Sequence, residues 1–280
     1  NSVLTGRKDG CMIIAEESTA WPKVTHRPED DGLGFTFKWN MGWMHDFLEY
    51  MKLDPIYRKF NHNHMTFGLT YSTSENFILV LSHDEVVHLK CSMINKMPGI
   101  YEDKFANLKA GYTFMLGHPG KKLLFMGQDF GQFHEWDEKV SLDWYLADEP
   151  LHADLQSYVR GLLTLYRKYP CLSRLDNDYA GFQWINANDA DRSIFSFVRR
   201  DETKKKNLLF IINFTPVERA DYRVGVPKRG NFTLVLDSHH GYYEKNDDVH
   251  VYRSKKGECD GQPYSFSYPL PPYGTAVFRF

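Results

Sequence analysis

The first part of the chain alternates between short apolar runs and stretches with helical periodicity. Apolar residues recur every three to four positions over 41–52, 103–116 and 152–166, which predicts helices there. Strands are predicted for four short apolar segments, 11–15, 33–38, 77–82 and 122–126. Strands that alternate with helices are typical of a parallel α/β unit.

Beyond residue 176 the pattern changes to short segments in which β-branched and aromatic residues alternate with polar ones. This spacing predicts an antiparallel β-sandwich. We therefore place a domain boundary between 1–175 and 176–280. The predicted strands of the second domain are 182–186, 193–199, 208–214, 222–226, 232–237, 264–268 and 274–280.

Composition narrows the class of protein. The chain has 280 residues, of which 42% are hydrophobic, and a net charge of -2, so it is neither a disordered tail nor a nucleic-acid binder. We expect no membrane span, because the longest apolar runs are too short, and no signal peptide is recognisable, so a cytoplasmic protein is predicted. The four cysteines lack metal-site spacing, which predicts unpaired thiols and no metal. A high aromatic content, with 20 Phe, 17 Tyr and 6 Trp, is compatible with stacking on sugar rings.

Polar residues follow each of the four predicted parallel strands. In α/β units the ends of the strands are where reactive side chains lie. Carboxylates that meet there suit glycoside chemistry, in which one acts as acid and others stabilise or attack the sugar. Partial burial of Glu16 would favour the protonated form that a general acid needs, and His83 could donate a hydrogen bond to a sugar hydroxyl beside Asp84. The clusters are Glu16-Glu17, Lys38-Trp39-Asn40, His83-Asp84-Glu85 and Gln128-Asp129.

Taken singly, each cluster has a simpler explanation. Residues 16–19 could cap a helix, and residues 83–85 could be a solvated turn, an ion pair or a metal site. Trp39 and Trp43 are four residues apart and could be core residues. Asn40 could serve only its loop, and Gln128 could lie in a plain turn.

Several motifs, taken in order, resemble the glycogen branching enzymes of the α-amylase superfamily. The similarity extends from about residue 15 to residue 143 and resumes weakly in the β region. The motifs that carry it are AEEST, GLGFTFKWNMGWMHD, LSHDEVVHLK, KMPG, GHPGKKLLFMGQDFGQFHEW and SLDW, followed by FQWIN and NFTP.

The resemblance implies an enzyme that cleaves an α-1,4-glucan such as glycogen, amylose or starch and rejoins the piece through an α-1,6 bond. It implies a retaining glycosyltransfer with no metal or organic cofactor, on a (β/α)8 barrel of which this chain has strands five to eight. Glu16 would be the general acid/base and Asp84 the transition-state stabiliser. Further substrate contacts are predicted for His83, Trp39, Asn40, Trp43 and Gln128.

The chain departs from the family pattern in three places. No G-F-R-x-D stretch is present, so the nucleophilic Asp and the N-terminal half of the barrel are missing. Leu89 and Cys91 stand where glycine or a small residue is expected, and Gln128-Asp129 replaces Asn-Glu. We therefore expect the chain to need its missing half, another copy or a different wrapping of its strands to be stable, and to be inactive or nearly so alone.

The leading hypothesis is part of a branching enzyme of glycogen or starch biosynthesis. Three alternatives remain: a non-catalytic α-glucan-binding fragment, an α-amylase-type hydrolase, and a structural fragment without sugar affinity. Reducing ends separate hydrolysis from branching, and glucan binding separates the other two.

Overall fold

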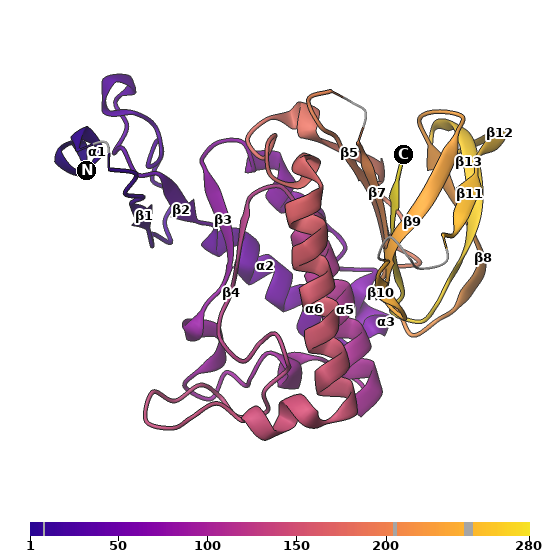
Figure 1. Ribbon diagram of the computed structural model, residues 1–280, viewed down its shortest axis with the longest axis horizontal. Coiled ribbons are helices and arrows are strands. Elements are labelled where there is room, and N and C mark those ends of the chain that lie inside the picture. Colours follow the sequence, from indigo (N-terminus) through magenta and orange to yellow (C-terminus); the bar gives the residue numbers. More distant parts are fainter. Residues whose placement is uncertain (8, 204–205, 244–248) are drawn as a thin grey trace.

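The computed structural model describes residues 1–7, 9–203, 206–243 and 249–280 (Figure 1). Its α-helices are α1 (Ser2–Gly6), α2 (Met41–Lys52), α3 (Pro55–Arg58), α4 (Asn63–Phe67), α5 (Tyr101–Gly117) and α6 (Pro150–Lys168). The strands of the first part are β1 (Ile14–Ala15), β2 (Phe37–Trp39), β3 (Phe77–Leu81) and β4 (Lys121–Leu124). The remaining strands are β5 (Phe182–Asn186), β6 (Ile194–Arg199), β7 (Leu208–Asn213), β8 (Arg219–Val226), β9 (Asn231–Asp237), β10 (Gly241–Tyr242), β11 (Val251–Arg253), β12 (Lys255–Cys259), β13 (Gln262–Leu270) and β14 (Thr275–Arg279).

The strands β1 to β4 form a parallel sheet in chain order, as predicted. The sheet is centred on β3, whose five aliphatic and aromatic residues are all buried, as expected for a strand covered on both faces. This is the arrangement expected for half of a (β/α)8 barrel; the assignment to strands five to eight stays a prediction.

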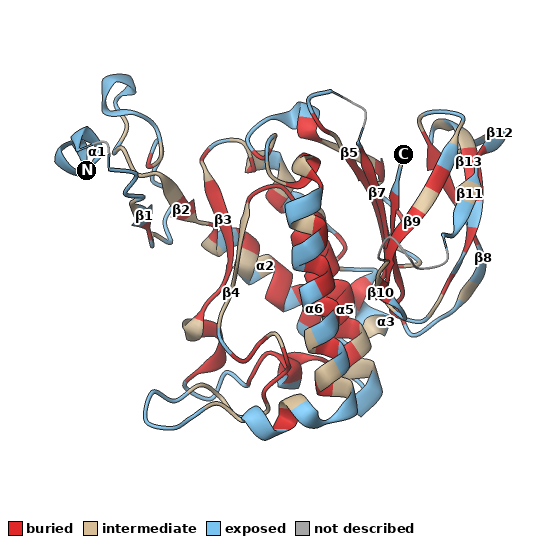
Figure 2. Ribbon diagram, in the orientation of Figure 1, coloured by how far each residue is buried: buried red, intermediate tan, exposed pale blue. Residues whose placement is uncertain are grey.

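The first two strands are shorter than predicted. The segment before β2 pairs with a loop instead, because the amides of Leu33 and Phe35 donate to the carbonyls of Lys23 and Val24. β1 is an edge strand, and residues 11 and 12 before it are exposed. Figure 2 shows this end of the sheet largely in pale blue, so one edge of the parallel sheet lies open.

The three predicted helices are confirmed, and α2 has the predicted bounds. Asn40 caps α2, because its Oδ1 accepts a hydrogen bond from the Trp43 amide at 2.9 Å. α5 is buried over most of its length, whereas α6 keeps one exposed face (Figure 2). The helices α3 and α4 were not predicted, because four or five residues are too few for a periodic signal.

The second part is an antiparallel sandwich, as predicted. Among the described residues, one sheet has seven strands in the order β10-β9-β14-β7-β6-β5, with β11 on β9, and the other has the order β12-β13-β8. One apolar core fills the space between these sheets. A second core lies on the opposite face of the larger sheet and is shared with α2, α5 and α6 (Figure 1). The short strands β10 to β12 were not predicted.

Two fully buried arginines join the helices to the β-sandwich. Arg58 donates to Asn107 Oδ1 at 3.0 Å and to the Phe214 carbonyl at 2.8 Å. Arg199 of β6 donates to the Gly117 carbonyl at the end of α5 and to Asp176. The domain boundary after residue 175 stays a prediction, since one core extends across it. In the described part of the chain, no helix has the length and apolar character needed to cross a bilayer.

Candidate active site

The four polar clusters lie at or after the carboxyl ends of the strands of one parallel sheet, with Lys38 and Trp39 as the last residues of β2, so they share one end of the sheet. Glu16 follows β1 and Asp84 follows β3, with β2 between them. Neighbouring strands are about 4.8 Å apart, which puts the ends of β1 and β3 roughly 10 Å from each other. Long side chains can converge across that distance.

Glu16 and Glu17 differ in their surroundings. Glu16 is exposed, so the predicted partial burial is wrong: β1 is an edge strand and nothing in the described chain covers its end. Glu17 forms an ion pair of 2.7 Å with the buried Nζ of Lys38, and it accepts the amide of Thr19. Hydrogen bonds from Lys38 and Thr19 lower the pKa of Glu17 to about 2. Residues 16–19 are a loop, and they do not begin a helix.

Trp39 and Asn40 line a groove of about 850 Å³ between the 17–26 loop, α2 and the segment before β3. Trp39 is half-buried, while Trp21 across the groove is 60% exposed. Asn40 is buried, and its Oδ1 also accepts a weaker bond from the Tyr71 hydroxyl at 3.4 Å. Among the described residues the Asn40 Nδ2 has no hydrogen-bond partner. An aromatic groove of this size is large enough for a sugar chain.

Trp43 does not belong to this groove. Only 2% of its surface is exposed, and its indole stacks on Phe47 at 4.8 Å within the core. A side chain in that position cannot contact a sugar, so the predicted binding role of Trp43 is wrong. It faces inward because it lies in the first turn of α2, four residues before Phe47 and on the same side of the helix.

His83 and Asp84 lie together in a 3-10 turn, His83–Val86, that directly follows β3. The turn begins with a capping box, in which the Ser82 hydroxyl accepts the Asp84 amide and Glu85 accepts the Ser82 amide. His83 Nε2 is 3.2 Å from Asp84 Oδ1, and both side chains are partly exposed. The turn therefore presents an imidazole and a carboxylate to solvent while its backbone is fixed.

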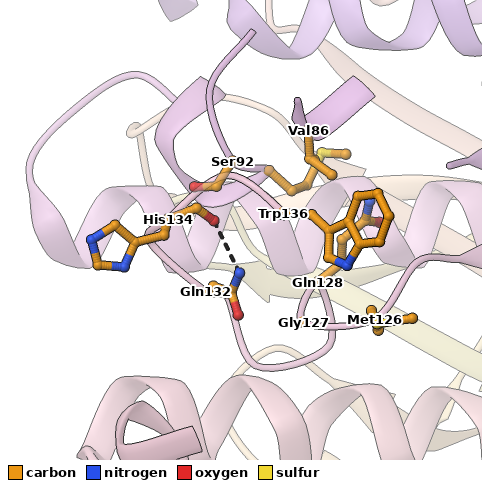
Figure 3. Close-up of a pocket in the computed structure, with 9 residues that line it drawn as sticks. Val86, Ser92, Met126, Gly127, Gln128, Gln132, His134 and Trp136 are labelled. Carbon is orange, nitrogen blue, oxygen red and sulfur yellow. Dashed lines mark hydrogen bonds between the residues drawn. The ribbon is translucent and has the colours of Figure 1, made fainter. Parts of the chain in front are cut away.

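Gln128 is buried behind Trp136, as Figure 3 shows. Its Nε2 donates to the Leu81 carbonyl at 3.2 Å, which ties the end of β4 to the end of β3. The cavity beside it, about 10 Å³, holds no more than a water molecule. In this arrangement Gln128 supports the strand ends, and the predicted direct contact with sugar is not supported.

Several residues that shape this end of the sheet were not predicted from the sequence. Glu135 accepts the backbone amides of Leu89 and Cys91, and Lys90 Nζ donates to the Asp84 carbonyl. A signal was available, since Glu135 and Trp136 belong to the FHEW stretch that carries the resemblance. Their partners lie some 45 residues away in the sequence, so the pattern gave no indication of the contact.

The cysteines are unpaired within the described residues: Cys11 and Cys91 are exposed, Cys171 is buried and Cys259 is intermediate. The described side chains include no group of three or more His, Cys, Asp or Glu placed to hold a metal ion.

Comparisons with known proteins point in one direction. Residues 184–280 match the family described as alpha amylase, C-terminal all-beta domain. The 1,4-alpha-glucan branching enzyme GlgB of Butyrivibrio fibrisolvens is 57% identical over 100% of this chain and 44% of its own length. The GlgB of Gloeobacter violaceus is 49% identical over 96% of this chain and 37% of its own length. The chain thus spans less than half the length of these relatives.

Solved structures share the fold at low identity. A type I pullulanase from Bacillus subtilis, complexed with maltose, superposes with a TM-score of 0.70 at 15% identity, over 100% of this chain and 41% of its own. An alpha-amylase from H. orenii superposes with a TM-score of 0.61 at 15% identity, over 99% of this chain and 55% of its own. At this identity the likeness concerns the fold alone.

Proposed function

We propose, on the premise that this chain is homologous over its whole length to the C-terminal part of the 1,4-α-glucan branching enzymes, that it carries half of a branching active site. In this proposal Glu16 is the general acid/base, Asp84 stabilises the transition state and His83 binds a hydroxyl of the reacting sugar. The observation that carries the proposal is the parallel pairing of β1, β2 and β3, which brings Glu16 and the His83–Asp84 turn to one edge.

The difference between the two neighbouring glutamates favours Glu16. Glu17 is held by Lys38 and Thr19, whose hydrogen bonds lower its pKa to about 2 and so oppose the protonated form that a general acid needs. Glu16 has an exposed carboxyl group at the rim of the sheet. A segment that covers the end of β1 would bury Glu16 and favour its protonated form.

The reaction would proceed in two steps. Glu16 protonates the oxygen of the α-1,4 bond while a carboxylate nucleophile forms a covalent glycosyl intermediate. Glu16 then removes the proton from the 6-hydroxyl of an acceptor glucan, which attacks the same carbon and forms the α-1,6 branch. The nucleophile is not among the strand-end residues of this chain, so it must come from the missing N-terminal half, and we expect this chain alone to be inactive.

The proposed setting is glycogen or starch biosynthesis in the cytoplasm, with amylose-like α-1,4-glucan as substrate. The test uses a longer protein that restores the missing barrel strands, incubated with amylose. Falling iodine colour with constant reducing ends indicates branching, whereas rising reducing ends indicate an α-amylase-type hydrolase.

Matched variants identify the acid. Glu16→Gln should lower the branching rate by a factor of about 10² to 10⁴. Glu17→Gln should have a much smaller effect, since it perturbs the contacts with Lys38 and Thr19 and no reacting group. Full activity of Glu16→Gln would refute the assignment.

A second candidate, α-glucan binding without cleavage, is favoured by the groove beside Trp39. It predicts that the longer protein binds α-glucan without forming any product, and that Trp39→Ala abolishes this binding.

A further inference from the structure

Glu135 joins two loops that follow different strands of the parallel sheet. One of its carboxylate oxygens accepts the Leu89 amide at 2.9 Å, and the other accepts the Cys91 amide at 2.7 Å. Leu89 and Cys91 lie in the loop after β3, and Glu135 lies in the loop after β4. Both carboxylate oxygens of Glu135 therefore accept hydrogen bonds from the backbone of one short segment, residues 89–91.

That segment has an unfavourable backbone. His88, Leu89 and Cys91 have φ values of 55°, 64° and 67°, in the left-handed region that side chains with a β-carbon rarely adopt. Leu89 is 95% exposed, so no packing of its side chain offsets the strain. The two charge-assisted hydrogen bonds to Glu135 help to hold this conformation, together with the bond of 3.2 Å from the Lys90 amide to the Val87 carbonyl.

The strained segment reaches back to the turn that carries His83 and Asp84. Lys90 lies between Leu89 and Cys91, whose amides donate to Glu135. Its Nζ donates to the Asp84 carbonyl at 2.7 Å. Lys96 in turn contacts the Lys90 carbonyl. The direction of the Lys90 side chain thus depends on the backbone that Glu135 holds.

The residue after Glu135 contacts the same turn from a second direction. The Trp136 amide donates to the Val86 carbonyl at 2.9 Å, and its indole packs edge-on against the His83 ring with centroids 5.9 Å apart. Figure 3 shows Trp136 close to Val86 and pointing away from the exposed His134. Glu135 and Trp136 together fix both ends of the His83–Val86 turn.

We propose that Glu135 is a positioning residue for the His83–Asp84 pair, acting through the strained loop 88–91 and Lys90. The proposal rests on the catalytic role proposed for that pair. Glu135 itself does not touch the reacting sugar. Its carboxylate holds the loop so that Lys90 anchors the backbone of Asp84 and the turn keeps one geometry.

The test is Glu135→Gln, with hydrogen exchange of individual amides measured in this chain without glucan. Glutamine has nearly the same shape, but one of its two polar atoms is a donor and would face a donating amide. The amides of residues 83–86 should exchange roughly tenfold faster or more, as should those of Leu89 and Cys91. Glu138→Gln, an exposed carboxylate of the same loop, is the matched control and should change neither region.

A rescue experiment separates positioning from general loosening. In a Leu89→Gly/Cys91→Gly background two of the three residues with positive φ adopt it without strain, so Glu135→Gln should accelerate exchange at residues 83–86 much less. Faster exchange confined to 88–91 would overturn the proposal, and so would an equal acceleration throughout the chain or an absence of rescue.

Activity provides an independent measurement. In the longer protein with the barrel restored, Glu135→Gln should lower kcat and leave KM for amylose within about twofold, because the loss falls on the reacting group and not on glucan binding. An unchanged kcat would contradict the proposal. If the unmodified longer protein does not branch amylose, the proposed function fails, while the exchange result still decides whether Glu135 holds the turn.

Discussion

Arg199 offers the sharpest test of how the helical part and the β-sandwich are held together. Its side chain is 0% exposed, and its guanidinium donates to three groups: the Gly181 carbonyl at 3.1 Å, the Gly117 carbonyl at 2.8 Å and Asp176 Oδ1 at 2.9 Å. Arg199→Met keeps most of the volume and removes all three bonds. The two carbonyls and one carboxylate oxygen would then lack this partner in a buried site.

The expected loss follows from those contacts. Removing one partner of a buried ion pair lowers the free energy of unfolding by about 3–5 kcal/mol. Asp176 keeps its second ion pair, with Lys121 Nζ at 2.8 Å, which places the expected loss near the lower end of that range. For a chain of this size the loss corresponds to a fall in Tm of roughly 6–15 °C.

Arg199→Met should also change how the free energy of unfolding depends on pH. Burial alone would raise the pKa of Asp176, but the charges of Lys122, Arg199 and Lys121 outweigh burial and lower the pKa from 3.8 to about 2. Because the folded-state pKa is depressed, Asp176 contributes about 2 kcal/mol of stability above pH 3.8, which is lost as the pH falls toward 2. In Arg199→Met the folded-state pKa of Asp176 should move back toward 3.8, so this contribution and its loss at low pH should both be smaller.

Urea unfolding at pH 7 and pH 3.5, followed by circular dichroism, measures both effects. Arg167→Met, an exposed arginine on α6, is the matched control and should stay within about 0.5 kcal/mol of the unmodified chain. If Arg199→Met unfolds within about 1 kcal/mol of the unmodified chain, the three bonds do not hold the junction and the argument is refuted.

Three further predictions concern single residues. Leu89→Gly should raise the free energy of unfolding by up to about 1 kcal/mol, since φ 64° strains leucine more than glycine costs in chain entropy; a lower urea midpoint would contradict this. Trp43→Ala should cost about 3–5 kcal/mol because the indole is in the core, whereas Trp39→Ala should leave the urea midpoint nearly unchanged and weaken retention in amylose gels; the reverse pattern would place the sugar platform at Trp43. Burial lowers the pKa of Lys122 from 10.5 to about 7, so the unfolded state binds more protons between those values and stability should rise from pH 7 to pH 10; Lys122→Met should flatten that rise, and an unchanged slope would show that another group causes it.

The open edge of the parallel sheet explains why a partner segment is expected. β1 pairs only with β2 among the described strands, and Ile14 and Trp21 near it are exposed. A closed barrel removes such edges and covers such residues. A longer protein with barrel strands before β1 should therefore protect the β1 amides from exchange, and under the proposed function it would also supply the nucleophile.

The sequence by itself determined which segments are helices and strands wherever the hydrophobic pattern is long or strongly periodic. The bounds of α2 and β5 were predicted to the residue, because their apolar faces repeat at the helical and strand periods. The order of the motifs along the chain predicted the resemblance to branching enzymes. The parallel order of β1 to β4 also followed from the sequence, since strands alternated with helices.

Only the tertiary structure decided which of the candidate side chains can meet a sugar. Trp39 and Trp43 are four residues apart and look alike in the sequence, yet one lines a groove and the other stacks on Phe47. The sequence could not show that Glu17 forms an ion pair with Lys38, 21 residues away, while Glu16 has no ion pair among the described side chains. It could not show Glu135 holding the loop beside Asp84 either, because such contacts join segments far apart in the chain, and only the packing of the sheet brings them together.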